Sequence, residues 1–157
     1  MVLLTGAVTP EATAIRSPKM TVPSIYSSSP QRWLDYKRDE LGDHILGGRS
    51  KYHRNLMHNT VVRFEEEDDT YIIRYHNTDI ITYYEDHILI DVDGWETVTT
   101  KVRLNAHTPF SFWQEKGIWY FSVPETAGEY RYLDGLKFVA EEDKWYVRLP
   151  SNLEVNV

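Results

Sequence analysis

The chain has 157 residues, a formal net charge of −7 and no cysteine. This length fits one domain with a hydrophobic core. The lack of cysteine excludes disulfides, thiolate nucleophiles and zinc–thiolate sites. The negative charge argues against a protein that grips a phosphate backbone, because such proteins gain affinity from a basic surface. It fits solubility or a basic partner.

Residues 1–29 are predicted to form an extended arm. Pro10, Pro18 and Pro23 punctuate a Ser-, Thr- and Ala-rich stretch, and each proline favours extended backbone in the residue before it. An ordered arm of this kind needs a surface, either its own domain or a neighbouring subunit, so we expect a route to oligomerisation. The N-terminus lacks the basic flank of a signal peptide, and no apolar run is long enough to span a bilayer. We therefore expect no membrane contact and an intracellular location.

A helix is predicted over residues 30–46, at the start of a single β-rich domain that covers residues 30–157. Ser29 is expected to cap this helix, with Pro30 at its first position. We expect Gly47-Gly48 to end it, with glycine in the left-handed C-cap conformation. Four apolar side chains recur at helical spacing: Trp33, Leu34, Leu41 and Ile45.

From about residue 60 the pattern is typical of β-strands. We predict strands near residues 60–65, 70–76, 79–84, 87–92, 110–115, 117–123, 129–133, 136–140 and 144–149. The turns between them are short, as at Asp93-Gly94 and Lys116-Gly117, which makes neighbouring strands antiparallel. The predicted fold class is therefore mainly β, an antiparallel meander in a curled sheet or sandwich.

One short helix is predicted to interrupt the strands, because residues 99–107 lose the period of two. Thr99 or Thr100 is expected to cap it, and it should end before Pro109. We expect its inward residues to be Val102 and Leu104 or Ala106. Trp95, just before it, is expected to be a core or lid aromatic.

No recognisable catalytic motif is present, so we predict no catalytic residue, no cofactor and no metal. Two groups of residues remain open as sites if the fold brings them together. The candidate metal group is His76, Asp79 and His107. The candidate phosphate-directed group is Glu96, Lys101, Arg103 and His107. The ordinary alternatives are surface histidines and an ion-paired helix surface.

Two sets of residues are candidate partner contacts. Five consecutive carboxylates lie at a predicted hairpin tip, either as a solvated turn or as a cation-binding or phosphate-mimicking surface: Glu65, Glu66, Glu67, Asp68 and Asp69. Adjacent aromatics in two strands must point to opposite faces of the sheet, so one of each pair faces outward. The aromatic candidates are Trp113, Tyr120 and Tyr146.

Three segments resemble an uncharacterised family of small proteins encoded mainly by tailed bacteriophages. These segments are His76–Thr82 (HNTDIIT), Gly94–Asn105 (GWETVTTKVRLN) and Gly117–Tyr120 (GIWY). The chain departs from the family pattern at Glu96, where a basic residue is expected. The resemblance implies a phage setting and no particular activity. From the residues themselves, Thr78 and Asp79 are expected to bond the hairpin backbone.

We therefore expect a non-enzymatic phage protein that acts by protein–protein contact, as a virion or assembly component whose arm lies on a neighbour. The first alternative is an acidic inhibitor of a host defence or nucleic-acid-processing protein. An enzyme acting on nucleic acid comes third, since no direct nucleic acid contact is expected. Host cytoplasm, with incorporation into the virion, is the expected location.

Overall fold

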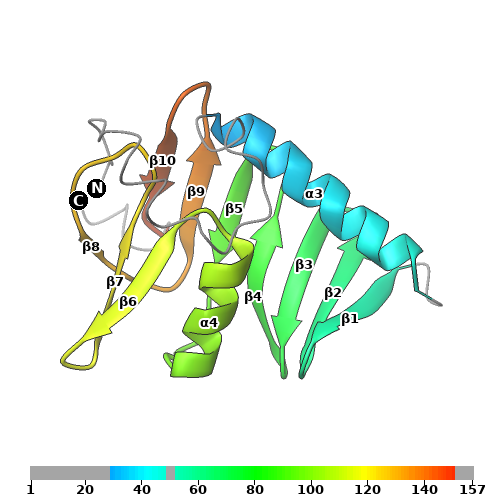
Figure 1. Cartoon of the computed structure of the whole chain (residues 1–157), viewed down its shortest axis with the longest axis horizontal. Helices are drawn as coiled ribbons and strands as arrows, with labels where there is room; N and C mark the ends of the chain where they lie inside the picture. The colour runs from blue at the N-terminus through cyan, green and yellow to red at the C-terminus, as the bar shows by residue number, and fades with distance from the viewer. Residues whose placement is uncertain (1–28, 49–51, 151–157) are drawn as a thin grey trace.

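A computed structural model describes residues 29–48 and 52–150 of the protein (Figure 1). Within these residues the protein is mainly β, with antiparallel sheets, one N-terminal helix and one short inserted helix. The predicted fold class is confirmed. The arm predicted for residues 1–29 lies outside the described residues, apart from its last one.

The N-terminal helix α3 (Pro30–Leu46) has the predicted bounds. The Ser29 hydroxyl accepts a hydrogen bond from the Arg32 N–H at 3.5 Å, and Pro30 occupies the first position. All four side chains of the predicted apolar stripe are buried, together with Lys37. The helix therefore packs the expected face onto the sheet.

The predicted left-handed end of α3 is wrong, because Gly47 keeps a right-handed φ of −73°. The Arg54 guanidinium donates to the His44 carbonyl at 3.0 Å and so caps the end of the helix. A Cβ on Gly47 would lie 2.7 Å from Arg54 Nη1, and one on Gly48 would lie 2.9 Å from Arg54 Cδ. A side chain at either position would therefore displace the Arg54 side chain.

The larger sheet has seven antiparallel strands in the order β1-β2-β3-β4-β5-β9-β10. Their bounds are β1 (His53–Met57), β2 (Thr60–Glu65), β3 (Thr70–Tyr75), β4 (Thr78–Tyr83), β5 (His87–Ile90), β9 (Leu136–Ala140) and β10 (Trp145–Arg148). Every predicted strand of this sheet is present, with small shifts at its ends. The edge strand β1 was not predicted. Its side chains are mostly exposed, so it lacks the alternation of a half-buried strand.

The smaller sheet contains β6 (Ser111–Glu115), β7 (Ile118–Ser122) and β8 (Tyr130–Arg131) in that order. The turn between β6 and β7 has φ of +51° at Lys116 and +79° at Gly117. Positive φ at both central residues is the type I′ geometry that suits a two-residue hairpin. The predicted turn at these residues is confirmed.

Both helices and the smaller sheet lie on the same face of the larger sheet (Figure 1). The core between these layers is rich in aromatic rings, with Phe110 stacked on Phe138 at 4.1 Å and Trp33 edge-on to Trp145 at 6.2 Å. Trp119 and Trp145 face this core, whereas Tyr120 and Tyr146 are half-buried on the other side of their strands. The predicted alternation of these pairs is confirmed.

The inserted helix α4 (Val98–His107) is present, but two details of its prediction are wrong. Its cap is Thr97, whose hydroxyl accepts from the Thr100 N–H at 3.2 Å. Thr100, Arg103 and Leu104 point inward. Val102, which is 49% exposed, and Ala106, which is also exposed, lie on the outer side of the helix.

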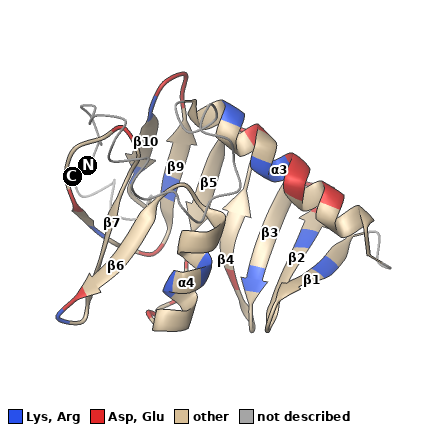
Figure 2. Cartoon of the chain, in the orientation of Figure 1, with Lys and Arg blue, Asp and Glu red and all other residues tan. Residues whose placement is uncertain are grey.

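Charged side chains are distributed unevenly over the two layers. Figure 2 shows acidic residues gathered along the second half of α3, where Asp39, Glu40 and Asp43 lie. Among the described residues, lysines and arginines lie on both helices, on several strands and in turns. Neither of the described helices is long and apolar enough to cross a membrane.

Candidate functional site

A pocket of about 420 Å³ lies between the turn that joins β3 to β4 and the start of α4. Residues of two separate stretches line it: Tyr75, His76, Asn77, Thr78, Ile80, Trp95, Thr97, Thr99 and Thr100. These stretches coincide with the His76–Thr82 and Gly94–Asn105 segments. The fold therefore brings the two most distinctive segments of the sequence to one concave site.

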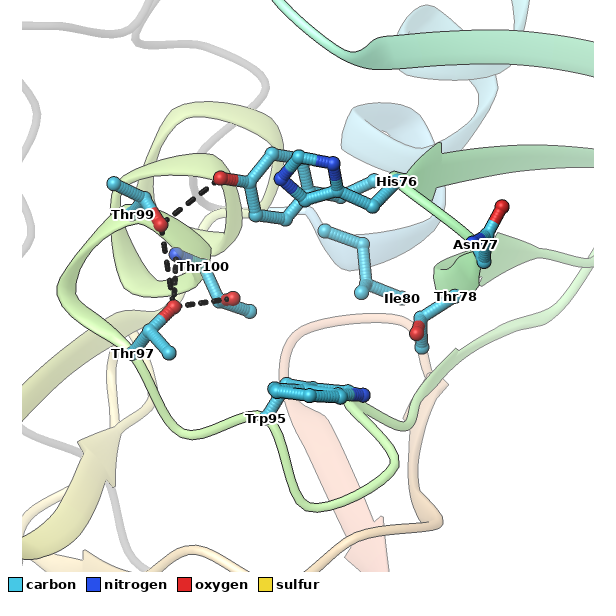
Figure 3. Close-up of a pocket in the computed structure, with 9 residues that line it drawn as sticks. His76, Asn77, Thr78, Ile80, Trp95, Thr97, Thr99 and Thr100 are labelled. Carbon is cyan, nitrogen blue, oxygen red and sulfur yellow. Dashed lines mark hydrogen bonds between the residues drawn. The ribbon is translucent and has the colours of Figure 1, made fainter.

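Aromatic side chains lie on two sides of this pocket, with Trp95 on one side and His76 on the other (Figure 3). One wall is Trp95, which is 63% exposed, so the expectation that it belongs to the core is wrong. The other wall is Tyr75 with His76 packed against it, at a ring separation of 4.2 Å. His76 has a φ of +54°, which turns the chain sharply after β3. The pocket is thus a slot between aromatic surfaces.

Threonine hydroxyls form the end of the slot that belongs to α4 (Figure 3). The Tyr75 hydroxyl donates to Thr99 Oγ1 at 3.0 Å. Thr97 Oγ1 lies 3.2 Å from Thr99 Oγ1 and 2.8 Å from Thr100 Oγ1. The bond between Tyr75 and Thr99 connects strand β3 to the first turn of α4. The bonds among the threonines stabilise that turn.

Arg103 packs against the site and is only 6% exposed. Its guanidinium carbon lies 3.9 Å from the centre of the Tyr75 ring, a cation–π contact. It donates to Thr60 Oγ1 at 2.8 Å and to the carbonyls of Thr99 and His58 at 2.9 Å each. This fork of hydrogen bonds joins α4 to the larger sheet.

The loop that presents Trp95 is held by a tight turn and by Asp134. The Trp95 N–H donates to the Val92 carbonyl, and φ is positive at both intervening residues, which is again type I′ geometry. The Asp134 carboxylate accepts from the N–H groups of Val92 and Gly94, at 2.8 Å each, and from the Tyr132 hydroxyl at 2.6 Å. Burial, and then the hydrogen bond to this carboxylate, raise the pKa of Tyr132. The loop is therefore fixed to the strand region after β8.

Replacing Asp134 by asparagine is expected to lower the free energy of unfolding by about 1.5 kcal/mol, because an amide NH₂ group would face one of the two N–H donors. The Trp95 indole N–H resonance is expected to shift in the same variant. Denaturant unfolding and two-dimensional NMR check this, with the exposed Asp143→Asn as the control. An unchanged Trp95 resonance would show that Asp134 does not position the loop.

The candidate metal group does not come together. Asp79 accepts two hydrogen bonds from the Arg63 guanidinium, at 2.8 Å each, and these bonds lower the pKa of Asp79. His107 instead lies against Lys37, with 3.2 Å between Nδ1 and Nζ. Within residues 29–48 and 52–150, no three His, Asp or Glu side chains are placed to hold a metal ion. Asp79 was expected to bond the hairpin backbone. It bonds the Arg63 side chain instead.

The candidate phosphate-directed group is also separated. Arg103 is engaged beneath Tyr75, and Lys101 lies over the Trp119 ring at 5.8 Å. His107 is next to Lys37 of α3, while Glu96 is exposed beside Trp95. These residues serve different contacts and do not form one catalytic site.

The five carboxylates lie at the tip of the β2–β3 hairpin, as predicted, and two of them are paired. Glu65 accepts from Arg63 at 2.8 Å, and Asp69 lies 3.2 Å from the Arg38 guanidinium of α3. Glu66, Glu67 and Asp68 are exposed. The tip therefore presents a smaller negative surface than its sequence indicates.

The three aromatic candidates fall on two different surfaces. Trp113 and Tyr120 are half-buried cross-strand neighbours of the smaller sheet, with ring centres 6.2 Å apart. Tyr146 lies on the edge strand β10 of the larger sheet, with the Lys144 ammonium 5.1 Å from its ring centre. The sequence did not predict the more exposed surface along α4. It consists of Trp95, Val98, Val102 and Ala106, which we call the α4 row.

The fold and the slot together define a mainly β protein with a mixed aromatic and threonine pocket. The family model described as Kyanoviridae Gp96 protein matches residues 44–145, more than half of the chain. The chain therefore belongs to the Kyanoviridae Gp96 family, a bacteriophage protein family. The matched residues include all the residues that line the slot. Comparison with curated proteins and with solved structures gives no match.

Proposed function

We propose that this phage protein acts by protein–protein contact, as a virion or assembly component, and that the α4 row is its contact surface. The observation that carries the proposal is the exposure of large apolar side chains along one side of α4. Val98 is 66% exposed and Val102 is 49% exposed, next to the 63% exposed Trp95.

The spacing of these residues supports a contact surface. Val98, Val102 and Ala106 follow one another at intervals of four, so they form one line on the helix. A contiguous apolar surface with a tryptophan at its end is typical of a protein interface, where aromatic anchors supply most of the binding energy. The candidate enzyme groups, by contrast, are separated in the fold.

The test compares purified phage particles assembled with the wild-type protein and with Val102→Asp. We expect stoichiometric incorporation of the wild type and at least a tenfold loss for the variant, about 1.4 kcal/mol, because a charge would be buried at the interface. Mass spectrometry of the particles measures it. Leu46→Asp is the matched control, because Leu46 is an exposed apolar residue at the end of α3.

Circular dichroism and thermal unfolding establish that both variants fold like the wild type. Equal incorporation of Val102→Asp and wild type would show that the α4 row is not the contact surface. Absence of the wild type from particles would overturn the virion assignment.

A second candidate is an acidic inhibitor of a host protein, which the exposed carboxylates along α3 favour (Figure 2). These side chains would meet a basic surface on the target, as electrostatic complementarity requires. In that case the protein is missing from particles, co-purifies with one host protein, and releases it at high salt.

A further inference from the structure

We propose that the outer face of the larger sheet binds helix α3 of a second copy of this chain. Both helices and the smaller sheet lie on the other face of that sheet (Figure 1). Strand pairing places six side chains in one row across the outer face: Arg63, Ile72, Thr82, Leu89, Lys137 and Arg148. The contact goes beyond the proposed function, because it involves neither the α4 row nor a different protein.

The row on the outer face alternates with core side chains of the same strands. Ile73 and Phe138, each next in sequence to a member of the row, are fully buried between the layers. Lys137 and Arg148 are exposed, and Leu89 is half-buried. The outer face is therefore partly apolar, and it is basic where β9 and β10 lie.

The cations on β9 and β10 repel one another. Lys137 and Arg148 are directly opposite in the strand register, and like charges in such positions destabilise a sheet. Among the described residues, neither of the two has a partner in an ion pair or a hydrogen bond. Lys144 adds a third positive charge on the same side, with its ammonium 5.1 Å from the centre of the Tyr146 ring. An anionic partner would relieve this repulsion.

Helix α3 carries a matching line of carboxylates on its outer side (Figure 2). Asp35, Asp39 and Asp43 follow one another at intervals of four, and all three are exposed. Like charges at this spacing are neighbours on a helix and destabilise it. This line would therefore also gain from a partner of the opposite charge, and the outer face of a second copy supplies one.

The two charged lines have similar lengths. Asp35 and Asp43 are eight residues apart on a helix, which is about 12 Å. Lys144 and Arg148 are four residues apart in extended chain, which is about 13 Å. A helix that lies along β10 can therefore place a carboxylate near each of these two cations at once.

The two surfaces lie on opposite sides of one molecule, because α3 covers one face of the larger sheet and the outer face is the other (Figure 1). A single molecule cannot bring them together, so the contact must join two copies. Each copy then uses a different surface toward each neighbour. Such head-to-tail contacts produce a ring or a filament, which suits an assembly component.

A nucleic acid is the other anion that a basic surface could bind, and the outer face fits it less well. Proteins that follow a nucleic acid backbone place cations along its whole path. Beyond Lys137 the row is uncharged as far as Arg63, whose guanidinium is paired with Asp79 at 2.8 Å. An acidic helix requires only the local cluster of cations and the apolar side chains beside it.

Sedimentation velocity of the full chain measures the contact. We expect the mass to rise with protein concentration at low ionic strength and to return to that of the monomer at about 0.5 M salt. One double variant is Lys137→Glu with Arg148→Glu, and the other is Asp39→Lys with Asp43→Lys. Each is expected to weaken self-association about tenfold or more, because like charges then meet at the contact. Arg131→Glu, exposed on the smaller sheet, is the matched control and is expected to associate like the wild type.

A mixture of the two double variants identifies the partner surface. The reversed sheet of one variant meets the reversed helix of the other with opposite charges, so the mixture is expected to associate like the wild type. Neither variant is expected to do so alone. This rescue cannot come from misfolding, and circular dichroism establishes that each variant is folded. Val102→Asp is expected to keep self-association while it loses incorporation into particles, so this inference and the proposed function fail separately.

Three outcomes would overturn the inference. The first is a wild-type mass that does not depend on protein concentration. The second is a mixture that does not recover association, which would show that α3 is not what covers the outer face. The third is a monomeric wild type that binds a single-stranded oligonucleotide of mixed sequence through Lys137 and Arg148, which would assign the outer face to nucleic acid.

Discussion

Replacing Arg103 by alanine is expected to lower the free energy of unfolding by about 3 kcal/mol. The substitution removes three hydrogen bonds, to the Thr60 hydroxyl and to the carbonyls of Thr99 and His58, although the Thr60 hydroxyl still donates to the His58 carbonyl at 2.9 Å. A hydrogen bond made by a charged group contributes about 1.5–3 kcal/mol. The cation–π contact with Tyr75 and the packing of the aliphatic stem are lost as well. Urea unfolding monitored by far-UV circular dichroism measures the change.

The matched control is Arg131→Ala, because Arg131 is exposed on β8 and its loss is expected to change stability by less than about 0.5 kcal/mol. Arg103→Lys keeps the charge but not the planar fork, so it is expected to recover less than half of the lost stability. A loss below about 1 kcal/mol in Arg103→Ala would show that the free energy of desolvating the buried guanidinium nearly cancels the free energy gained from its contacts.

Arg103 also affects the residues that line the slot. Arg103 packs on the Tyr75 ring, with its guanidinium carbon 3.9 Å from the ring centre, and it fixes the first turn of α4 through the Thr99 carbonyl. We expect Arg103→Ala to broaden or shift the resonances of both Tyr75 and Thr99, even under conditions where the protein stays folded. Its role in the site is to position other residues.

Much of the fold was predictable because local signals agreed with one another. The Ser29-Pro30 start of α3, the Asp93-Gly94 and Lys116-Gly117 turns and the alternation in most strands each have a local physical cause. The failures have non-local causes. Strand β1 exists because it pairs with β2, and the end of α3 is capped by Arg54, a residue of that strand.

The slot was harder to predict than the strands. Its two halves were recognised as distinctive segments, but their convergence depends on where the β3–β4 turn lies relative to α4. Val102 and Leu104 are two residues apart and so lie on opposite sides of a helix, and the structure buries the side that carries Leu104 and leaves Val102 on the surface. The sequence predicted Arg103 as a member of the candidate phosphate-directed group. A sequence does not reveal that an arginine will be buried against a tyrosine ring.

Lowering the pH from about 7 to about 5 is expected to destabilise the protein by about 2 kcal/mol through His107 alone. Burial and the neighbouring charges of Lys37 and Arg103 lower the pKa of His107 from 6.5 to about 3. The Lys37 ammonium has only donors, so Nδ1 of His107 must be the acceptor of their 3.2 Å contact, and the ring is neutral in the folded state. The ammonium of Lys37 is paired with Glu40 at 2.8 Å.

The sign follows from the two states. Above pH 6.5 the ring is neutral in both, and His107 contributes no pH dependence. Between 6.5 and about 3 the unfolded chain binds a proton that the folded protein does not, so stability falls as the pH falls. His107→Gln keeps an acceptor for Lys37 without a titrating group, and the difference in unfolding free energy between pH 7 and 5 is expected to shrink by about 2 kcal/mol.

Urea unfolding at several pH values between these limits measures that difference, and His58→Gln is the matched control because its imidazole is exposed. Glu85 and Asp91 have raised pKa values, from contact with Asp69 and from burial respectively, and so act in the opposite direction. Their contribution is common to the wild type and the variants and cancels in the comparison. If His107→Gln kept the full pH dependence, the ring would have to accept a proton in the folded state. The contact between α3 and α4 would then open to solvent on acidification, since two cations cannot remain 3.2 Å apart in a buried site.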